Sequence, residues 1–275
     1  MSVETEPLNL NGYTMNAGWM KGINHRLLLL VLLFIISSLT AYPLENQLTI
    51  AKANTAYTSG RYQDAINIYL TVVSEGLESP DLYYNIGNAY FKLNDIPHAI
   101  LWYERARRID PGNEDVNFNL NVANSRVSDK IEPMPELFYR RWLNQLTSQF
   151  STDAWAKAGI AFFILAVLLG SIYVASRVLA LRKIGFWTGL TSLLVSVVFL
   201  LFSLGSFSSL KSEQSAIITN PTVTIKSSPD EKSTDIFVLH EGSKVRLIDH
   251  IGDWYEIRIA NGSVGWVFQS SLEKI

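Results

Sequence analysis

Apolar residues recur at helical spacing over residues 47–73 and again over about residues 80–113. The two stretches repeat one another, because a shift of 34 residues aligns Ala99 with Ala65 and aromatic residues with aromatic residues. Each stretch is also interrupted once by residues that favour a turn. The pattern predicts two consecutive pairs of helices that stack side by side.

The second stretch carries the residues that define a known repeat. In chain order they are Tyr83, Ile86, Gly87, Tyr90, Ala99, Tyr103, Ala106 and Pro111. These residues and the period of 34 resemble the tetratricopeptide repeat. Gly87 and Ala99 would let the two helices approach, while Tyr90 and Tyr103 would fill the remaining gap. We expect these small and aromatic residues to form core rather than a cofactor site.

The resemblance implies a ligand groove on the first helix of each pair. The residues it places there are Gln47, Ile50, Asn54, Tyr57, Thr58, Tyr84, Asn88, Phe91 and Lys92. Asn54 and Asn88 could hold a peptide main chain by their side-chain amides, or could be solvated surface. A chaperone-type carboxylate clamp is not expected, because Ile50 and Tyr84 stand where that clamp has basic residues.

Two repeats need a cap at their open end. We assign residues 46–130 to the two repeats and a capping helix. The apolar stripe of the capping helix consists of Val116, Leu120, Ala123 and Val127.

Residues 131–152 form a linker with a short amphipathic helix. The apolar face and the basic residues beside it consist of Phe138, Trp142, Leu146, Arg140 and Arg141. A basic helix with aromatic residues directly before a membrane span is typical of a segment in the membrane interface. Packing against the repeats is the alternative.

Two long apolar runs follow, and we predict transmembrane helices over residues 154–180 and 184–210. The connector between the uncharged runs holds Arg177, Arg182 and Lys183 and no acidic residue. By the positive-inside rule this connector is cytoplasmic, which places both flanking domains outside. We expect Ser151 to cap the first of these helices.

Small residues lie on one face of the second run. They are Gly185, Gly189, Ser192 and Ser196. This spacing lets helices pack closely in a membrane. Three roles remain open for this face: contact with another subunit, contact with the first run, or no contact.

Residues 25–42 have a short basic flank, an apolar run of about ten residues and then small residues. This layout is typical of a secretory signal, since a spanning helix needs about 20 apolar residues. We assign residues 1–41 to a leader and signal peptide, with Met20 as an alternative start. An uncleaved signal anchor is the other interpretation.

Residues 215–275 change to the alternation of short strands separated by glycine-containing turns, which predicts a small barrel of about five strands. The order of KSSP, VLHEG, GDWYEIR and NGSVGWV resembles a bacterial SH3 domain. The resemblance implies a groove lined by Trp254, Tyr255 and Trp266. Domains of this family often bind cell-wall peptides or protein segments.

The composition narrows the functional classes. A formal net charge of −2 gives no electrostatic basis for binding nucleic acid. The chain has no cysteine, which excludes disulfides and thiolate metal sites. Its four histidines show neither metal-ligand nor catalytic-triad spacing, so we expect no enzyme, no metal site and no cofactor.

The order of these segments, with the linker PMPELFYRRW between repeats and hairpin, resembles BatE-type proteins of the bacterial aerotolerance operon. The resemblance covers about residues 25–275. It implies a multi-pass protein of the bacterial inner membrane whose repeats and SH3-like domain face the periplasm. The partners it implies are envelope proteins, namely von Willebrand A-domain proteins and a MoxR-type ATPase system.

The expected fold class is a multidomain α plus β membrane protein: an α-helical tetratricopeptide repeat solenoid, a two-helix transmembrane hairpin and a small all-β SH3-like barrel. The expected function is that of a membrane-anchored envelope scaffold that binds proteins through both modules, in an aerotolerance or stress complex. The alternatives are a cell-wall anchor or sensor that binds peptidoglycan through the SH3-like domain, and a non-catalytic subunit of an envelope hydrolase.

Overall fold

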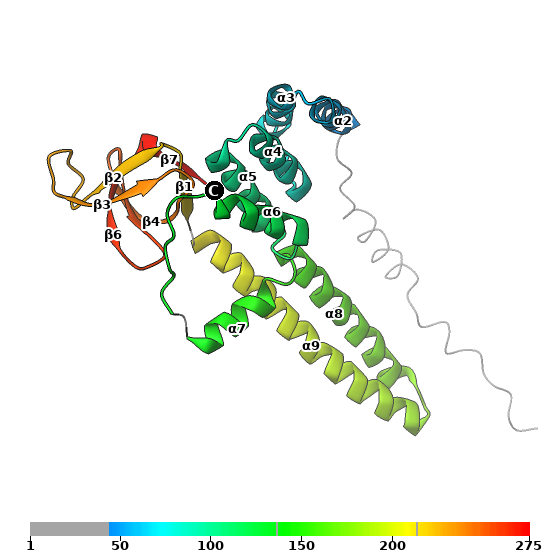
Figure 1. Ribbon diagram of the computed structural model, residues 1–275. Coiled ribbons are helices and arrows are strands. Elements are labelled where there is room, and N and C mark those ends of the chain that lie inside the picture. Colours follow the sequence, from blue (N-terminus) through cyan, green and yellow to red (C-terminus); the bar gives the residue numbers. More distant parts are fainter. Residues whose placement is uncertain (1–43, 136, 213) are drawn as a thin grey trace, which may run out of the picture.

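The computed structural model describes residues 44–135, 137–212 and 214–275 (Figure 1). The expected leader and signal, residues 1–41, lies outside the described residues. A helical repeat region, a long helical hairpin and a β-barrel follow one another along the described chain. This arrangement confirms the expected fold class.

Five helices build the repeat region. They are α2 (Leu44–Thr58), α3 (Tyr62–Ser74), α4 (Pro80–Lys92), α5 (Ile96–Ile109) and α6 (Glu114–Ser125). The turns inside the two pairs correspond, since Gly60 and Asn94, which the repeat aligns, both have left-handed backbones with φ of 77° and 63°. Asp95 then caps α5 by accepting a hydrogen bond from the backbone N–H of His98.

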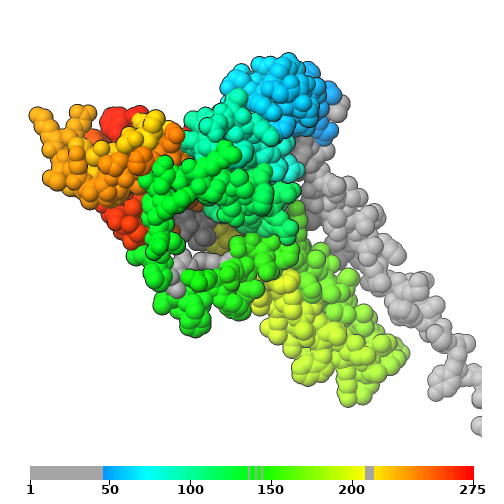
Figure 2. Space-filling view, in the orientation of Figure 1, coloured from blue at the N-terminus to red at the C-terminus, as the bar shows by residue number. Residues whose placement is uncertain are grey.

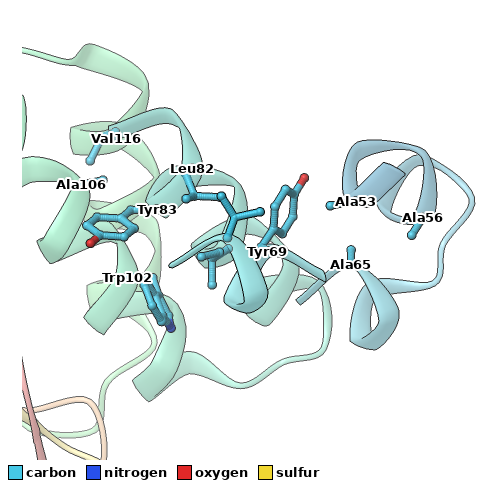
Figure 3. Close-up of a cluster of buried hydrophobic side chains, with 11 residues drawn as sticks. Ala53, Ala56, Ala65, Tyr69, Leu82, Tyr83, Trp102, Ala106 and Val116 are labelled. Carbon is cyan, nitrogen blue, oxygen red and sulfur yellow. The ribbon is translucent and has the colours of Figure 1, made fainter. Parts of the chain in front are cut away.

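The two helices of the second pair touch at Gly87. A Cβ at this position would lie 2.6 Å from Cδ1 of Tyr103, so a larger residue would have to displace that ring. Ala99 and Tyr103 are buried, which confirms them as core. Tyr90 is partly exposed. Figure 3 shows the adjoining core, which combines alanines with large side chains: Ala53, Ala56, Ala65, Tyr69, Leu82, Tyr83 and Trp102.

The capping helix α6 buries its apolar stripe against the second repeat. Val116, Leu120 and Ala123 are buried within the helix, and Val127 is buried just beyond its end. The stripe that the sequence predicts is therefore the contact face.

The short helix α7 (Phe138–Thr147) contacts α9 of the hairpin. Its aromatic side chains are exposed, Phe138 by 84% and Trp142 by 60%. The alternative of packing these aromatic residues against the repeats is therefore not what the structure shows.

Two helices form the hairpin, α8 (Thr152–Ala175) and α9 (Leu179–Ser212). Among the described residues, these are the helices long and apolar enough to cross a membrane. Ser151 caps α8 as expected, because its Oγ accepts from the N–H of Ala154. Helix α9 begins at Leu179, ahead of the expected residue 184. Basic residues are good helix formers, so the helix runs through Arg182 and Lys183 and leaves a turn of residues 176–178.

The small-residue face of α9 packs on α8. A Cβ on Gly185 would lie 2.9 Å from a main-chain oxygen of α8. Ser192 Oγ donates to Phe162 O and Ser196 Oγ donates to Gly159 O, both at 2.8 Å. Of the three roles left open for this face, the structure selects contact with the first run.

Seven short strands form the barrel. They are β1 (Ser215–Ile218), β2 (Thr222–Lys226), β3 (Asp235–His240), β4 (Lys244–Ile251), β5 (Trp254–Arg258), β6 (Val264–Phe268) and β7 (Leu272–Lys274), with a 3-10 turn, η2 (Gln269–Ser271), before the last. All pairings are antiparallel, in the order β3-β2-β6-β5-β4-β1-β7. The sequence predicts about five strands because β1 and β7, which pair with each other, are too short to show alternation.

The repeat region and the barrel pack directly against each other. Ile217 of β1 is fully buried in a cluster with Leu101, Leu120 and Val127. At the turn between β3 and β4, a Cβ on Gly242 would lie 2.8 Å from Val127. Figure 1 shows β1 and β7 beside α5 and α6. The sequence predicts two separate modules, whereas the structure joins them into one body.

The hairpin projects from this body (Figure 2). The turn that follows α5 rests on the segment ahead of α8, because Gly112 closely approaches the main-chain oxygen of Gln149. A side chain larger than hydrogen has no room at this contact. The repeats therefore sit directly on the end of the hairpin where α8 begins.

Candidate functional site

The expected groove residues lie on α2 and α4, and side chains of α6 meet them. Asn119 of α6 donates from its amide nitrogen to Tyr84 Oη at 2.9 Å and to Asn88 Oδ1 at 3.0 Å. Sequence reasoning missed Asn119, because the capping helix does not follow the repeat pattern at this position. The structure thus brings α4 and α6 together into one polar surface.

The two asparagines of the groove are held by tyrosines of the second helices. Tyr69 Oη donates to Asn54 Oδ1 at 2.5 Å, and Tyr103 Oη donates to Asn88 Oδ1 at 2.7 Å. Burial, with a smaller effect of Tyr57, raises the pKa of Tyr69 to about 12. Burial likewise raises the pKa of Tyr103. Both phenols therefore remain protonated donors at neutral pH.

These contacts decide what the asparagines can offer a ligand. Their amide oxygens already accept from tyrosines, while the amide nitrogens are donors. Asn54 is exposed and Asn88 is partly exposed. A bound peptide would therefore meet donors at both positions and would present its carbonyl oxygens to them.

Aromatic and basic side chains continue the same surface. Phe91 lies under the guanidinium of Arg126, with Cζ 4.4 Å from the ring centroid. Arg126 Nη1 also donates to Asn94 Oδ1 at 3.2 Å. Lys92 is exposed and Tyr57 is partly exposed. Arg126 comes from the end of the capping helix, so only the tertiary structure places it over Phe91.

The remaining groove candidates have mainly local roles. Gln47 is exposed, and the Thr58 hydroxyl donates to Thr55 O at 3.1 Å within its own helix. Ile50 is partly buried against the repeat core. Ile50 therefore supports the surface from beneath.

The three aromatic candidates of the barrel lie on two faces. Trp254 pairs across strands with Phe268, at 5.5 Å between ring centroids, and Trp266 pairs with Glu256. Alternation along β5 and β6 puts all four side chains on the outer face. Tyr255 points to the opposite face and packs against the barrel core. The structure brings Trp254 and Trp266 together and adds Phe268, but it separates Tyr255 from them.

A polar junction joins the repeats to the barrel, and no sequence pattern indicates it. Asp129, whose side chain is 15% exposed, accepts from His240 N at 2.7 Å, His240 Nδ1 at 2.8 Å and Ser243 Oγ at 2.6 Å. Burial by itself would raise the pKa of Asp129, but these hydrogen bonds outweigh it and lower that pKa. The carboxylate is therefore ionised at neutral pH and holds the β3–β4 turn.

One further ion pair strengthens the junction. Lys244 Nζ lies 2.9 Å from Glu104 Oε2, a buried carboxylate of α5 that Arg107 also contacts at 2.6 Å. Within the repeats, at the start of α5, His98 Nδ1 bonds Asp95 at 2.7 Å. That hydrogen bond raises the pKa of His98, although burial opposes the shift.

Comparisons with known proteins support the two modules separately. Residues 50–114 match the family model of the tetratricopeptide repeat. Residues 221–273 match the family model of the bacterial SH3 domain. A search of curated proteins finds no match to the chain. Repeats and SH3 domains of these kinds indicate binding to proteins or to the cell wall.

Proposed function

We propose that the chain is a non-enzymatic scaffold, anchored in the bacterial inner membrane, that binds a protein partner along the first helices of its repeats. The observation that carries this proposal is that α2, α4 and α6 present amide, phenol and aromatic groups, with Asn119 of α6 bonded to Tyr84 and Asn88 of α4. Asn54 and Lys92 on this surface stay exposed, because the barrel packs against α5 and the end of α6 instead.

The hairpin supports an arrangement with both modules on one side of the membrane. Helix α8 begins at Thr152 and α9 ends at Ser212, and Figure 1 shows these two ends together beside the repeats and barrel. Arg177 and Arg182 lie at the opposite end. The positive-inside rule favours a cytoplasmic location for that end, which leaves repeats and barrel in the periplasm.

We also propose that the chain acts in a BatE-type aerotolerance or stress complex. The support is the order of its parts: a segment that matches tetratricopeptide repeats, two apolar helices and a segment that matches bacterial SH3 domains. The candidate partners are von Willebrand A-domain proteins and a MoxR-type ATPase system.

Site-specific photo-crosslinking in intact cells tests the partner surface. A photoreactive residue at Asn54 or Lys92 should attach to a von Willebrand A-domain protein, because both positions lie on the exposed groove surface. The matched control is Asn67 on α3, which is exposed and contacts only Gln63 among the hydrogen bonds seen. The same products from Asn67, or none from the groove positions, would contradict the proposal.

The outer face of the barrel favours a second candidate function, binding to peptidoglycan. Trp254 and Trp266 are partly exposed there beside Phe268, and aromatic faces of this kind can stack on sugar rings. The full chain in detergent should then sediment with isolated peptidoglycan, and Trp254→Ala should reduce this binding. Residues 215–275 alone are unsuitable for this test, because Ile217 would be exposed. Equal sedimentation of wild type and variant would argue against the aromatic face.

A further inference from the structure

A cavity lined by both charged and apolar side chains lies where the repeats, the hairpin and the end of the barrel meet. Its volume is about 550 Å³. Arg105 and Arg108 of α5 line one side, and Thr152 and Asp153 at the start of α8 line another, with Phe207 of α9 next to them. This cavity is separate from the proposed partner surface on α2, α4 and α6.

The cavity lies at the ends of both apolar spans. Thr152 is the first residue of α8, and Phe207 lies five residues before the end of α9 at Ser212. The two helix ends are tied together, because Ser203 Oγ donates to Thr152 O at 3.1 Å. In a membrane this level is where hydrocarbon gives way to lipid headgroups. This step rests on the proposed membrane anchoring.

The end of the barrel positions the two arginines at the cavity wall. Arg105 Nη2 donates to Glu273 Oε1 at 3.1 Å and to Lys274 O at 2.6 Å. Arg108 Nη1 donates to Ile275 O at 2.8 Å. Held in this way, two planar guanidinium groups line a cavity at headgroup level, and such groups match the geometry of a phosphate.

Carboxylates balance these charges. Glu78 and Asp153 line the same half-open cavity, and Glu273 pairs with Arg105 beside it, so both guanidinium and carboxylate groups face this space. A purely anionic ligand would be repelled by the carboxylates. A ligand with one phosphate and one ammonium group would satisfy both kinds of side chain.

We infer that this cavity binds the headgroup of a zwitterionic phospholipid that carries an amine, such as phosphatidylethanolamine. The phosphate is placed at Arg105 and Arg108, and the ammonium group at Glu78 and Asp153. Phe207 marks the direction in which the acyl chains leave. Because the cavity is bordered by α5, α8, α9 and the end of β7, the bound lipid would join the repeats, hairpin and barrel.

Native mass spectrometry of the full chain in detergent tests this inference. After delipidation, the wild type should bind one phosphatidylethanolamine in preference to phosphatidylglycerol. Arg108→Gln should lower that affinity about tenfold, since it removes a charged phosphate ligand. Thr152→Phe, which keeps both guanidinium groups but fills the cavity, should lower it as well. Arg61→Gln, at an exposed ion pair with Asp64 on α3, is the matched control and should bind as the wild type does.

Three results of these binding measurements would overturn the assignment of a lipid site. Unchanged lipid binding by both cavity variants, or preference for phosphatidylglycerol, would overturn the inference. Inorganic phosphate that binds as tightly as the lipid would identify a free anion site instead and would also overturn it. Carbonate extraction of cell membranes separates this failure from failure of the proposed anchoring. A wild-type chain that stays in the membrane without binding the lipid refutes the cavity assignment alone.

Discussion

At the scale of single residues, the repeat reproduces hydrogen bonds as well as packing. The bond from Tyr69 to Asn54 recurs 34 residues later as the bond from Tyr103 to Asn88. The sequence indicates the two asparagines as ligand candidates and the two tyrosines as core. The pairing between them depends on the crossing of two helices, which the residue pattern does not describe.

The contact at Gly87 leads to a stability prediction. Gly87→Ala should lower the free energy of unfolding by about 1–3 kcal/mol, because the new Cβ overlaps the buried ring of Tyr103. Urea denaturation followed by circular dichroism measures the change. Gly205→Ala is the control, since a Cβ there meets nothing within 4 Å, and it should be neutral or slightly stabilising. An equal loss in both variants would show that the ring contact is not the cause.

The raised pKa of His98 predicts that the stability of the fold depends on pH. The hydrogen bond with Asp95 raises the pKa of the His98 ring in the folded state, so folding favours the protonated ring. That stabilisation is complete below the unfolded pKa of about 6.5 and is lost as the pH rises through the raised folded value. The unfolding temperature should therefore fall between about pH 6 and pH 8. His98→Gln should flatten this slope.

At the scale of elements, α7 differs from an ordinary surface helix because its aromatic side chains are exposed. Phe138, Tyr139 and Trp142 are exposed directly beside the hairpin. The sequence predicts an amphipathic helix in this segment. The fold places α7 next to α9. This position brings the exposed aromatic residues of α7 to the level where a membrane surface would lie.

Spin labelling tests the membrane contact of α7. Because the chain has no cysteine, Trp142→Cys gives a single labelling site. In vesicles the label should be accessible to oxygen and protected from a water-soluble nickel reagent, as expected at a lipid interface. Asn121→Cys, at an exposed position of α6, is the control and should show the reverse. Similar accessibility at both sites would place α7 in water.

At the scale of the whole molecule, the repeats and the barrel are joined by a direct junction. Ile217 and the bonds of Asp129 make the barrel a cap on the second repeat. A partner bound to the repeats and a partner bound to the barrel would therefore be held at a fixed distance from each other. A flexible tether would allow a range of distances instead.

Removing Asp129 tests the junction. Asp129→Ala should destabilise the chain by about 2 kcal/mol at neutral pH, because donors of His240 and Ser243 lose their acceptor. The lowered pKa means that the wild-type contribution is present above the unfolded pKa of about 3.9 and is lost as the pH falls through the folded value. The difference in unfolding temperature should therefore shrink in acid. Asp64→Ala, at an exposed ion pair, should show little effect at any pH.

Much of the architecture follows from the sequence alone. The repeat period, the cap on α8 at Ser151 and the stripe of α6 are local patterns, and each depends on residues close together in the chain. The groove candidates of α2 and α4 follow from the same period and await the crosslinking test. Local patterns do not extend to Asn119 and Arg126, which lie on a helix outside the repeat.

The sequence by itself determined the elements, because helical and strand periodicity are properties of neighbouring residues. Only the tertiary structure decided which elements meet. Asp129 and His240 are 111 residues apart, and Arg105 and Glu273 are 168 apart. Contacts over such separations depend on how complete elements pack against one another, and no spacing within the chain encodes them.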